Sequence, residues 1–216
     1  MLEKMGAFFD ARLDGYEEHQ LTCIESAQTF YPFTARCLPI DPGTHLLDLG
    51  CGTGLELEWY FRSAPEARVT GIDLSARMLE ALRGKFSGKD LTLMQGSYFE
   101  VPLGKEVFDA AVSVESLHHF TKEEKLGLYR RLHAALKEGG RFVLTDYFAD
   151  TDDQEQHFRQ ELLRLKAEQG LGDDVFYHYD TPLTWLREME ILREVGFREV
   201  TDLKRWGATH CIRALK

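Results

Sequence analysis

The chain has 216 residues, of which 44% are hydrophobic, and its formal net charge at pH 7 is −10. This length suits one core of ordinary size and is too short for two comparable domains. The acidic balance disfavours DNA and RNA as partners, because their phosphates are bound mainly by Lys and Arg. The four cysteines form no CxxC pair, and no apolar stretch approaches the roughly 18 residues of a membrane span, so we expect no zinc site, disulfide framework or membrane anchor. The expected compartment is cytoplasmic.

The first 43 residues are predicted to form a helical cap. Aromatic and apolar positions between Phe8 and Phe33 recur among charges at spacings that suit one or two amphipathic helices, and the stretch 38–43 (LPIDPG) ends them. From Thr44 the pattern changes to short apolar strands that alternate with helical segments. This alternation is typical of a parallel sheet covered on both faces. We therefore expect an α/β fold with a doubly wound, mostly parallel, Rossmann-like sheet of seven strands.

The core of this sheet should contain five of the strands and three helices. The predicted strands cover 45–49, 68–73, 90–95, 108–114 and 141–147, and the predicted helices cover 54–63, 75–86 and 122–137. Ser75 is placed to cap the second helix. Thr121 and Glu124 form a capping box for the third helix, and Gly139-Gly140 is predicted to end it.

The remainder of the chain predicts an insertion and a reversed strand. An acidic run and a helix to about Gln169 follow the fifth strand, and Thr181-Pro182 is predicted to open a helix that stops at Gly196. Strands near 199–205 and 209–215 are separated by too few residues for a parallel crossover, so they should form an antiparallel hairpin. We expect a single domain over 1–216, made of a helical cap (1–43), a cofactor-binding core (44–147), an insertion (148–182), and a terminal helix with the hairpin (183–216).

The strongest motif is LLDLGCGTG, residues 46–54, in which a buried strand ends in a carboxylate and three alternating glycines open a helix. Glycine lets the backbone approach a ligand closely. A dinucleotide fingerprint would require glycine at position 55, where the chain has Leu55. Asp48, Glu56 and Glu58 would also oppose a pyrophosphate at this helix start. The loop therefore argues against a nicotinamide-dependent oxidoreductase and suits a cationic ligand such as S-adenosylmethionine, which carries an ammonium and a sulfonium.

A second acidic residue, Asp73, ends the next strand within GIDLS, 19 positions beyond Gly54. A carboxylate at this place can accept hydrogen bonds from both hydroxyls of a ribose. An aspartate before a helix is as often a simple cap, so its pairing with the glycine loop is what makes the signal specific.

Together with GGRF (139–142), these two motifs resemble the successive motifs of class I S-adenosylmethionine-dependent methyltransferases over roughly residues 44–147. The resemblance implies that Gly50 and Gly52 contact the methionine part of the cofactor and that Asp73 holds the ribose. Where the family often has Asp for the adenine, this chain has Ser97. The full predicted set of cofactor residues is Tyr16, Asp48, Gly50, Cys51, Gly52, Asp73, Leu74, Met78, Ser97, Tyr98, Val114, Glu115 and His119. Met78 and Phe99 could flank the adenine ring, or they could be ordinary core.

The fourth strand ends in VESLHHF (114–120), which should face the reaction site because ligands lie beyond the carboxyl ends of the strands. This stretch lacks the Asn/Asp-Pro-Pro-aromatic pattern of enzymes that methylate nucleic-acid amino groups, and it resembles the loop of small-molecule methyltransferases. His118 or His119 could accept a proton from the acceptor near neutral pH, or could simply cap or pack the loop. We expect no metal, because Glu115 and Asp146 are too few acidic ligands.

The sequence thus predicts methyl transfer to a small molecule by in-line displacement. The candidates for contact with the acceptor are Tyr16, Tyr147, Tyr177, His178 and Tyr179. The alternative is a regulatory module that binds S-adenosylmethionine without turnover, and an enclosed cavity beside the methyl group would favour the enzyme. The identity of the acceptor, the attacking atom and the oligomeric state do not follow from the sequence.

Overall fold

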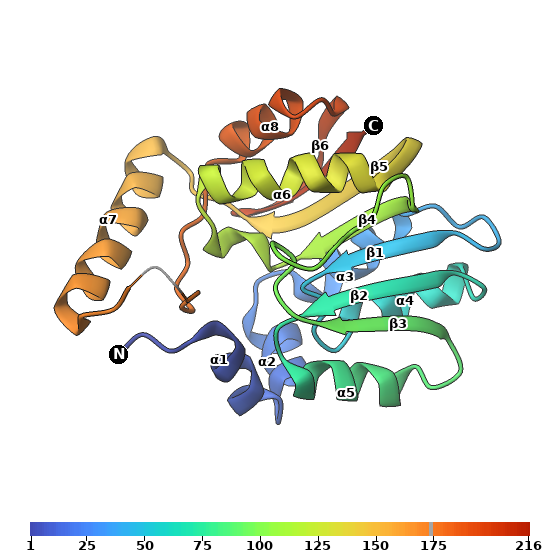
Figure 1. Ribbon diagram of the computed structural model, residues 1–216, viewed down its shortest axis with the longest axis horizontal. Coiled ribbons are helices and arrows are strands. Elements are labelled where there is room, and N and C mark those ends of the chain that lie inside the picture. Colours follow the sequence, from blue (N-terminus) through green and yellow to red (C-terminus); the bar gives the residue numbers. More distant parts are fainter. Residues whose placement is uncertain (173–174) are drawn as a thin grey trace.

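The computed structural model describes residues 1–172 and 175–216, and it contains one seven-stranded sheet with helices on both faces (Figure 1). The strand order is β3-β2-β1-β4-β5-β7-β6. The strands are β1 (His45–Leu49), β2 (Arg68–Asp73), β3 (Asp90–Gln95), β4 (Phe108–Val114), β5 (Leu136–Tyr147), β6 (Arg198–Trp206) and β7 (Thr209–Leu215). Strand β7 pairs antiparallel with both β5 and β6, whereas β1 to β5 pair in parallel. The predicted mixed sheet with one reversed strand is confirmed.

Helices cover the sheet on both sides. They are α1 (Met5–Arg12), α2 (Tyr16–Cys23), α3 (Ala27–Arg36), α4 (Leu55–Ser63), α5 (Ala76–Lys85), α6 (Lys122–Ala135), α7 (Asp152–Gln169) and α8 (Trp185–Glu194), with a short 3-10 turn, η1 (Leu117–His119). Side chains of α3, α4 and α5 pack in one apolar cluster, and those of α6 and α8 pack in another. Strands β1 and β4 lie between these clusters and are buried along almost their whole length, as expected for continuous apolar runs in a parallel sheet.

Two predicted helix starts are confirmed in atomic detail. The Ser75 hydroxyl accepts a hydrogen bond from the Met78 backbone N–H at 3.0 Å, and Thr121 and Glu124 form a reciprocal capping box at the start of α6. Each cap satisfies backbone donors that the first helical turn leaves without a partner. Helices α5 and α6 are thereby fixed at the edge of the sheet where β2 and β4 end.

The structure corrects two helix boundaries. Helix α6 ends at Ala135, because Leu136 already pairs with Phe108 as the first residue of β5, so Gly139-Gly140 lies inside the strand and does not end the helix. Helix α8 does not begin at Thr181-Pro182. The Thr181 backbone N–H donates to the His118 carbonyl oxygen at 2.9 Å, which holds this segment extended, and Thr184 caps α8.

The N-terminal cap contains three short helices, where the sequence predicted one or two. The helices are interrupted at Gly15, between α1 and α2, and at Ser26, between α2 and α3. Both residues have positive φ angles. Helix α1 packs near α5, and α3 packs against α4. Because these contacts carry α1 and α2 to the carboxyl edge of the sheet, the cap lies over the site described below (Figure 1).

Helix α7, all of whose residues are described, contains no buried side chain and stands out from the sheet (Figure 1). It belongs to the predicted insertion, and Thr151 caps its N-terminus with a hydroxyl that accepts from the Gln154 N–H. Among the described residues, none of the helices combines the length and the apolar composition needed to cross a lipid bilayer.

A buried ion pair links α6 and α8. Lys125 Nζ lies 2.6 Å from Glu188 Oε2, the Tyr129 hydroxyl donates to Glu188 Oε1, and all three side chains are almost fully buried. A lone charge at this depth would be strongly unfavourable, so each partner depends on the other. This pair fixes α6 and α8 relative to each other where they pack on the sheet.

Candidate active site

The glycine loop after β1 lies at the carboxyl edge of the sheet, where β1, β2 and β4 end. Gly50 and Gly52 have φ angles of +74° and +47°, a region that favours glycine. A Cβ atom on Gly50 would lie 2.1 Å from Ser116 Oγ, so the loop also needs glycine there to pass the residues that follow β4. Beside Gly52, the nearest atom to such a Cβ is the Tyr16 hydroxyl at 3.7 Å. The loop therefore forms a backbone surface facing the N-terminal cap.

Asp73 joins the glycine loop to the start of α5. Its Oδ2 accepts from the Gly52 N–H at 2.9 Å, and its Oδ1 accepts from the Ser75 N–H at 2.8 Å. Burial raises the pKa of this carboxyl, and the two N–H donors act in the opposite direction. A carboxylate offers about four acceptor positions, so these bonds leave capacity for further donors such as hydroxyls.

A first cavity, which we call the inner cavity, lies against the glycine loop and Asp73 and has a volume of about 50 Å³. Ten of the thirteen predicted cofactor residues line it: Tyr16, Gly50, Gly52, Asp73, Leu74, Met78, Tyr98, Val114, Glu115 and His119. Sequence reasoning missed Met5, Phe9 and Ser116, which also line it. Met5 and Phe9 reach the cavity only because α1 folds back over the sheet, and no local pattern signals that placement.

Three predicted cofactor residues lie elsewhere in the described structure. Asp48 is buried behind the loop, Cys51 packs against Gly71 on β2, and Ser97 accepts from the Phe99 N–H at 3.2 Å. Phe99 itself packs with the aromatic rings of Tyr98, Phe120 and Phe176. The position where the family often has an acid for adenine is therefore a turn residue in this chain.

Two carboxylates behind the loop retain unpaired oxygens. Asp48 Oδ2 and Glu56 Oε1 are buried and have no hydrogen-bond partner among the described residues. Burial, and then the neighbouring Glu56, raise the pKa of Asp48 well above its ordinary value. Burial also raises the pKa of Glu56. A cationic ligand beside the glycine loop would favour the ionised forms of these two carboxyls, whereas a phosphate would oppose them.

A second cavity, the outer cavity, has a volume of about 840 Å³ and opens between the N-terminal helices, η1 and the β6–β7 turn. Its lining is rich in aromatic rings and histidines, including Phe8, Phe9, Tyr16, Tyr147, His178 and Trp206. Four residues line both cavities: Phe9, Tyr16, Glu115 and His119. We call these four the junction. The two cavities meet there, at the end of β4.

Among the candidates for acceptor contact, the structure brings together Tyr16, Tyr147 and His178 at the outer cavity. The His178 ring stacks on Phe8, with the ring centroids 3.5 Å apart. Tyr177 and Tyr179 are not among the described residues that line this cavity. Tyr177 instead forms a bridge with Lys4, and the Tyr179 carbonyl oxygen lies 3.2 Å from His119 Nδ1.

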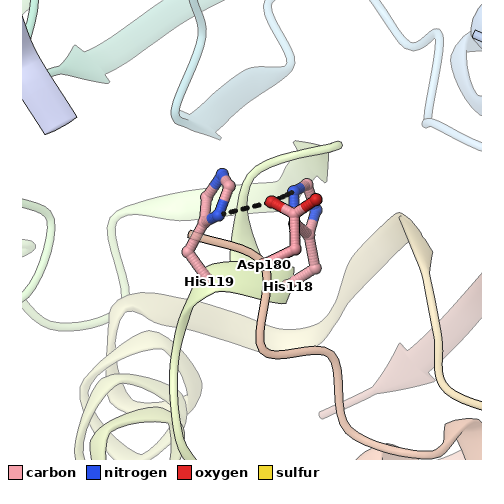
Figure 2. A group of neighbouring side chains, drawn as sticks. All are labelled: His118, His119 and Asp180. Carbon is pink, nitrogen blue, oxygen red and sulfur yellow. Dashed lines mark ion pairs between the residues drawn. The ribbon is translucent and has the colours of Figure 1, made fainter. Parts of the chain in front are cut away.

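The two histidines after β4 lie on the short turn η1, and both line the outer cavity. His118 Nδ1 lies 2.5 Å from Asp146 Oδ1 at the end of β5. The Asp146 carboxylate is 1% exposed and also accepts from the Leu117 and Tyr147 N–H groups. His118 and His119 both face Asp180, which comes from the extended segment before α8 (Figure 2).

These contacts give the two histidines different charge states. Burial opposes the charged form of His118, but the Asp146 carboxylate, and then Asp180, outweigh it and raise its pKa to about 10. Burial, and then the neighbouring His118 charge, lower the pKa of His119. Burial, and then Asp146, raise the pKa of Glu115 to about 8. In the ligand-free protein at neutral pH, His118 is therefore cationic, whereas His119 is neutral.

Comparisons with known proteins agree with this arrangement. Residues 46–140 match the model of the family described as methyltransferase domain. The chain is 27% identical to an uncharacterized methyltransferase of Geobacillus sp. (strain WCH70) over 200 residues, which are 91% of this chain and 88% of that protein. It is 32% identical to an uncharacterized methyltransferase of Synechocystis sp. over 119 residues, 55% of this chain and 54% of that protein.

Among solved structures, human N-acetylserotonin methyltransferase in complex with S-adenosylmethionine shares the fold, with a TM-score of 0.63 at 19% identity. The likeness covers 88% of this chain and 52% of the human one. This chain thus spans about half the length of the Synechocystis and human proteins.

The sheet order, the glycine loop and the acid after β2 define a class I methyltransferase fold. Together with the family match over residues 46–140 and the methyltransferase relatives, they support the assignment of this chain to the class I S-adenosylmethionine-dependent methyltransferases.

Proposed function

We propose that the protein transfers the methyl group of S-adenosylmethionine to a small molecule bound in the outer cavity. The main support for this proposal is that the two cavities share the four residues of the junction. Phe9, Tyr16, Glu115 and His119 line both a cavity built on the glycine loop and a larger cavity rich in aromatic residues. A group held in one cavity can meet a group held in the other only across these four residues.

The residues that line the inner cavity suit the cofactor, and because its volume of about 50 Å³ is too small for the whole molecule, the N-terminal cap must move outward on binding. Asp73 would accept from the ribose hydroxyls, and the backbone of Gly50 and Gly52 would lie along the methionine part. The unpaired oxygens of Asp48 and Glu56 lie behind the loop, and a ligand with positive groups would favour the ionised forms of both carboxyls. When bound there, S-adenosylmethionine would supply an electrophilic methyl group on its sulfonium.

The outer cavity suits an acceptor with an apolar, aromatic or ring-shaped body. Its volume of about 840 Å³ lies within the roughly 300–1,000 Å³ range of small-molecule sites. Phe8, Tyr147 and Trp206 offer flat apolar faces, while the histidines and acids supply a few polar contacts that can orient the acceptor. Orientation matters because methyl transfer requires the attacking atom, the methyl carbon and the leaving sulfur to lie in line. The net charge of −10 also favours a small molecule over nucleic acid as the acceptor.

The outer cavity separates an enzyme from a module that only binds the cofactor, because only the enzyme needs room for an acceptor beside the methyl group. Ala208 lines the outer cavity and is not among the residues that line the inner one, so Ala208→Phe would narrow the acceptor space alone. We expect this variant to bind S-adenosylhomocysteine as the parent does and to lose transfer to any acceptor that the parent methylates.

The test is calorimetric titration of the purified chain with S-adenosylmethionine, S-adenosylhomocysteine and NAD, followed by a labelled-methyl screen against small phenols, carboxylic acids, amines and thiols. Binding in the micromolar range of the two adenosyl ligands alone, with transfer to a small molecule that Ala208→Phe abolishes, would support the proposal. Absence of adenosyl binding would refute the cofactor assignment, and transfer unaffected by Ala208→Phe would refute the acceptor site.

A further inference from the structure

Three potential metal ligands converge where η1 meets the segment before α8 (Figure 2). Asp180 Oδ1 lies 3.5 Å from His118 Nε2 and 3.2 Å from His119 Nδ1. All three ligand atoms lie within 4.8 Å of one another, and all three residues line the outer cavity. The two histidines are adjacent in sequence, whereas Asp180 comes from a part of the chain about sixty residues further on.

The contacts of Asp180 are not ordinary hydrogen bonds. Its Oδ1 atom is fully buried, yet it accepts no hydrogen bond of acceptable geometry from the described residues, although two imidazole nitrogens lie within 3.5 Å. A buried carboxylate oxygen without a hydrogen bond is unfavourable unless a cation compensates it. In the metal-free protein the cationic His118 ring, 3.5 Å away, supplies that charge, and a divalent ion between the three ligand atoms would take its place.

Asp146 prepares His118 for this role. It holds Nδ1 of the ring at 2.5 Å and is itself held by the Leu117 and Tyr147 N–H groups. Once its Nε2 proton has left, the ring keeps the proton on Nδ1 and presents the Nε2 lone pair toward Asp180. A carboxylate behind a histidine is the usual outer support of metal-binding imidazoles. Asp146 belongs to a second group of potential ligands with Glu115 and His118, but its oxygens are already occupied by donors, so we assign it to orientation and not to binding.

The donor set indicates the type of ion. Two imidazole nitrogens and one carboxylate oxygen suit Zn²⁺, Mn²⁺, Fe²⁺ or Co²⁺, whereas Mg²⁺ and Ca²⁺ prefer oxygen ligands alone. Three protein ligands leave coordination positions open, and all three ligand residues line the outer cavity. His119 also belongs to the junction, so an ion held here would lie close to the point where the two cavities meet.

We propose that His118, His119 and Asp180 bind a divalent transition-metal ion that holds a hydroxyl of the acceptor at the junction. This inference rests on the proposed function, because it assigns the acceptor to the class of hydroxyl compounds. The ion would favour loss of the hydroxyl proton to water. The oxygen then forms a bond to the methyl carbon, the sulfur–carbon bond breaks, and the sulfur keeps its electron pair, which yields the methyl ether and S-adenosylhomocysteine without any oxidant.

Binding must displace two interactions of the metal-free protein, of which the first is the contact of the His118 Nε2–H group with Asp180. His119 Nδ1 lies 3.2 Å from the Tyr179 carbonyl oxygen, to which it can donate when protonated. Coordination through Nδ1 exchanges that proton for the ion, so metal binding should release protons to the buffer. From the sequence we considered only Glu115 and Asp146 as acidic ligands, because nothing in the sequence places Asp180 beside the histidines.

The experiment uses the full chain without an affinity tag, stripped with a chelator and titrated with Zn²⁺, Co²⁺ and Mg²⁺. We expect one Zn²⁺ or Co²⁺ per chain and a visible absorption band for bound Co²⁺, with far weaker binding of Mg²⁺. Asp180→Asn and His119→Gln should abolish the Co²⁺ band. Asp146→Asn should weaken binding by about 10- to 100-fold, the usual effect of losing the support behind a histidine ligand. His178→Gln is the matched control, since it removes a histidine from the same cavity but not from the ligand set.

Titration of each variant with S-adenosylhomocysteine separates this inference from the proposed function. If the adenosyl ligand binds but no transition metal does, or if Asp180→Asn and His178→Gln bind metal equally, the metal site is refuted and the methyltransferase assignment stands. If the adenosyl ligand does not bind at all, the proposed function fails, whatever the metal does. Metal binding that is lost in Asp180→Asn and kept in His178→Gln, with adenosyl binding unchanged in both, supports the site.

Discussion

Replacement of Asp73 by asparagine should weaken cofactor binding with almost no change in side-chain size. The carboxylate accepts from the Gly52 and Ser75 N–H groups at 2.9 and 2.8 Å and, in our account, from the ribose as well. Asparagine has nearly the same size but only one acceptor oxygen, and its amide N–H₂ group must face a donor. The variant therefore loses one charge-assisted hydrogen bond to the ligand and distorts the support of the glycine loop.

The expected size of the effect follows from the type of bond. Hydrogen bonds to charged groups contribute about 1.5–3 kcal/mol, which corresponds to a rise in the dissociation constant of roughly 10- to 150-fold. The assay is calorimetric titration with S-adenosylhomocysteine, with thermal unfolding of the free variant as a check on folding. Asp90→Asn is a suitable control, because Asp90 is exposed at the opposite end of the neighbouring strand β3. A folded Asp73→Asn variant with the affinity of the parent would refute the role given to this carboxylate.

Three further predictions concern the glycine loop and the core. Gly50→Ala should abolish adenosyl binding in titrations, because its Cβ would lie 2.1 Å from Ser116 Oγ at a φ of +74°; normal affinity would contradict the close approach. Lys125→Met should lower the free energy of unfolding by about 3–5 kcal/mol in urea titrations, because it leaves the Glu188 charge buried and unpaired; a loss below about 1 kcal/mol would contradict this. Because burial raises the pKa of Asp48 above 3.8, the native state keeps a proton that the unfolded chain releases, so stability should fall as pH rises from about 4 through the raised pKa. Asp48→Asn should reduce this fall, and a variant whose urea midpoint falls with rising pH as steeply as that of the parent would be evidence against it.

The strands and the cofactor motif could be predicted because their signals are local. Strands β1, β2, β3 and β4 have the predicted bounds. Strands β1, β2 and β4 are largely buried and therefore apolar, whereas the edge strand β3 alternates between exposed and partly buried positions. The glycine loop and Asp73 follow two adjacent parallel strands, and such strands end at the same edge of the sheet. Chain position alone therefore places Gly50, Gly52 and Asp73 together.

The outer cavity and the metal ligands could not be predicted in the same way. Asp180 reaches the histidines because the segment before α8 stays extended, held by the Thr181 N–H on the His118 carbonyl oxygen. The same segment is tied to the N-terminus, where the His178 N–H donates to the Glu3 carbonyl oxygen at 2.9 Å. These are backbone contacts between distant parts of the chain, and backbone groups are the same in every residue type. Thr181-Pro182 even resembles a helix start, so local chemistry pointed away from the observed contact.

The most direct test of the account is a crystal structure of the chain with S-adenosylhomocysteine bound. We expect the ribose hydroxyls on Asp73, the homocysteine part along Gly50 and Gly52, and the sulfur atom at the junction, facing the outer cavity between Tyr16 and His119. A ligand bound with its sulfur directed away from the outer cavity, or bound outside the inner cavity, would contradict the proposal that a methyl group crosses from one cavity to the other at these residues.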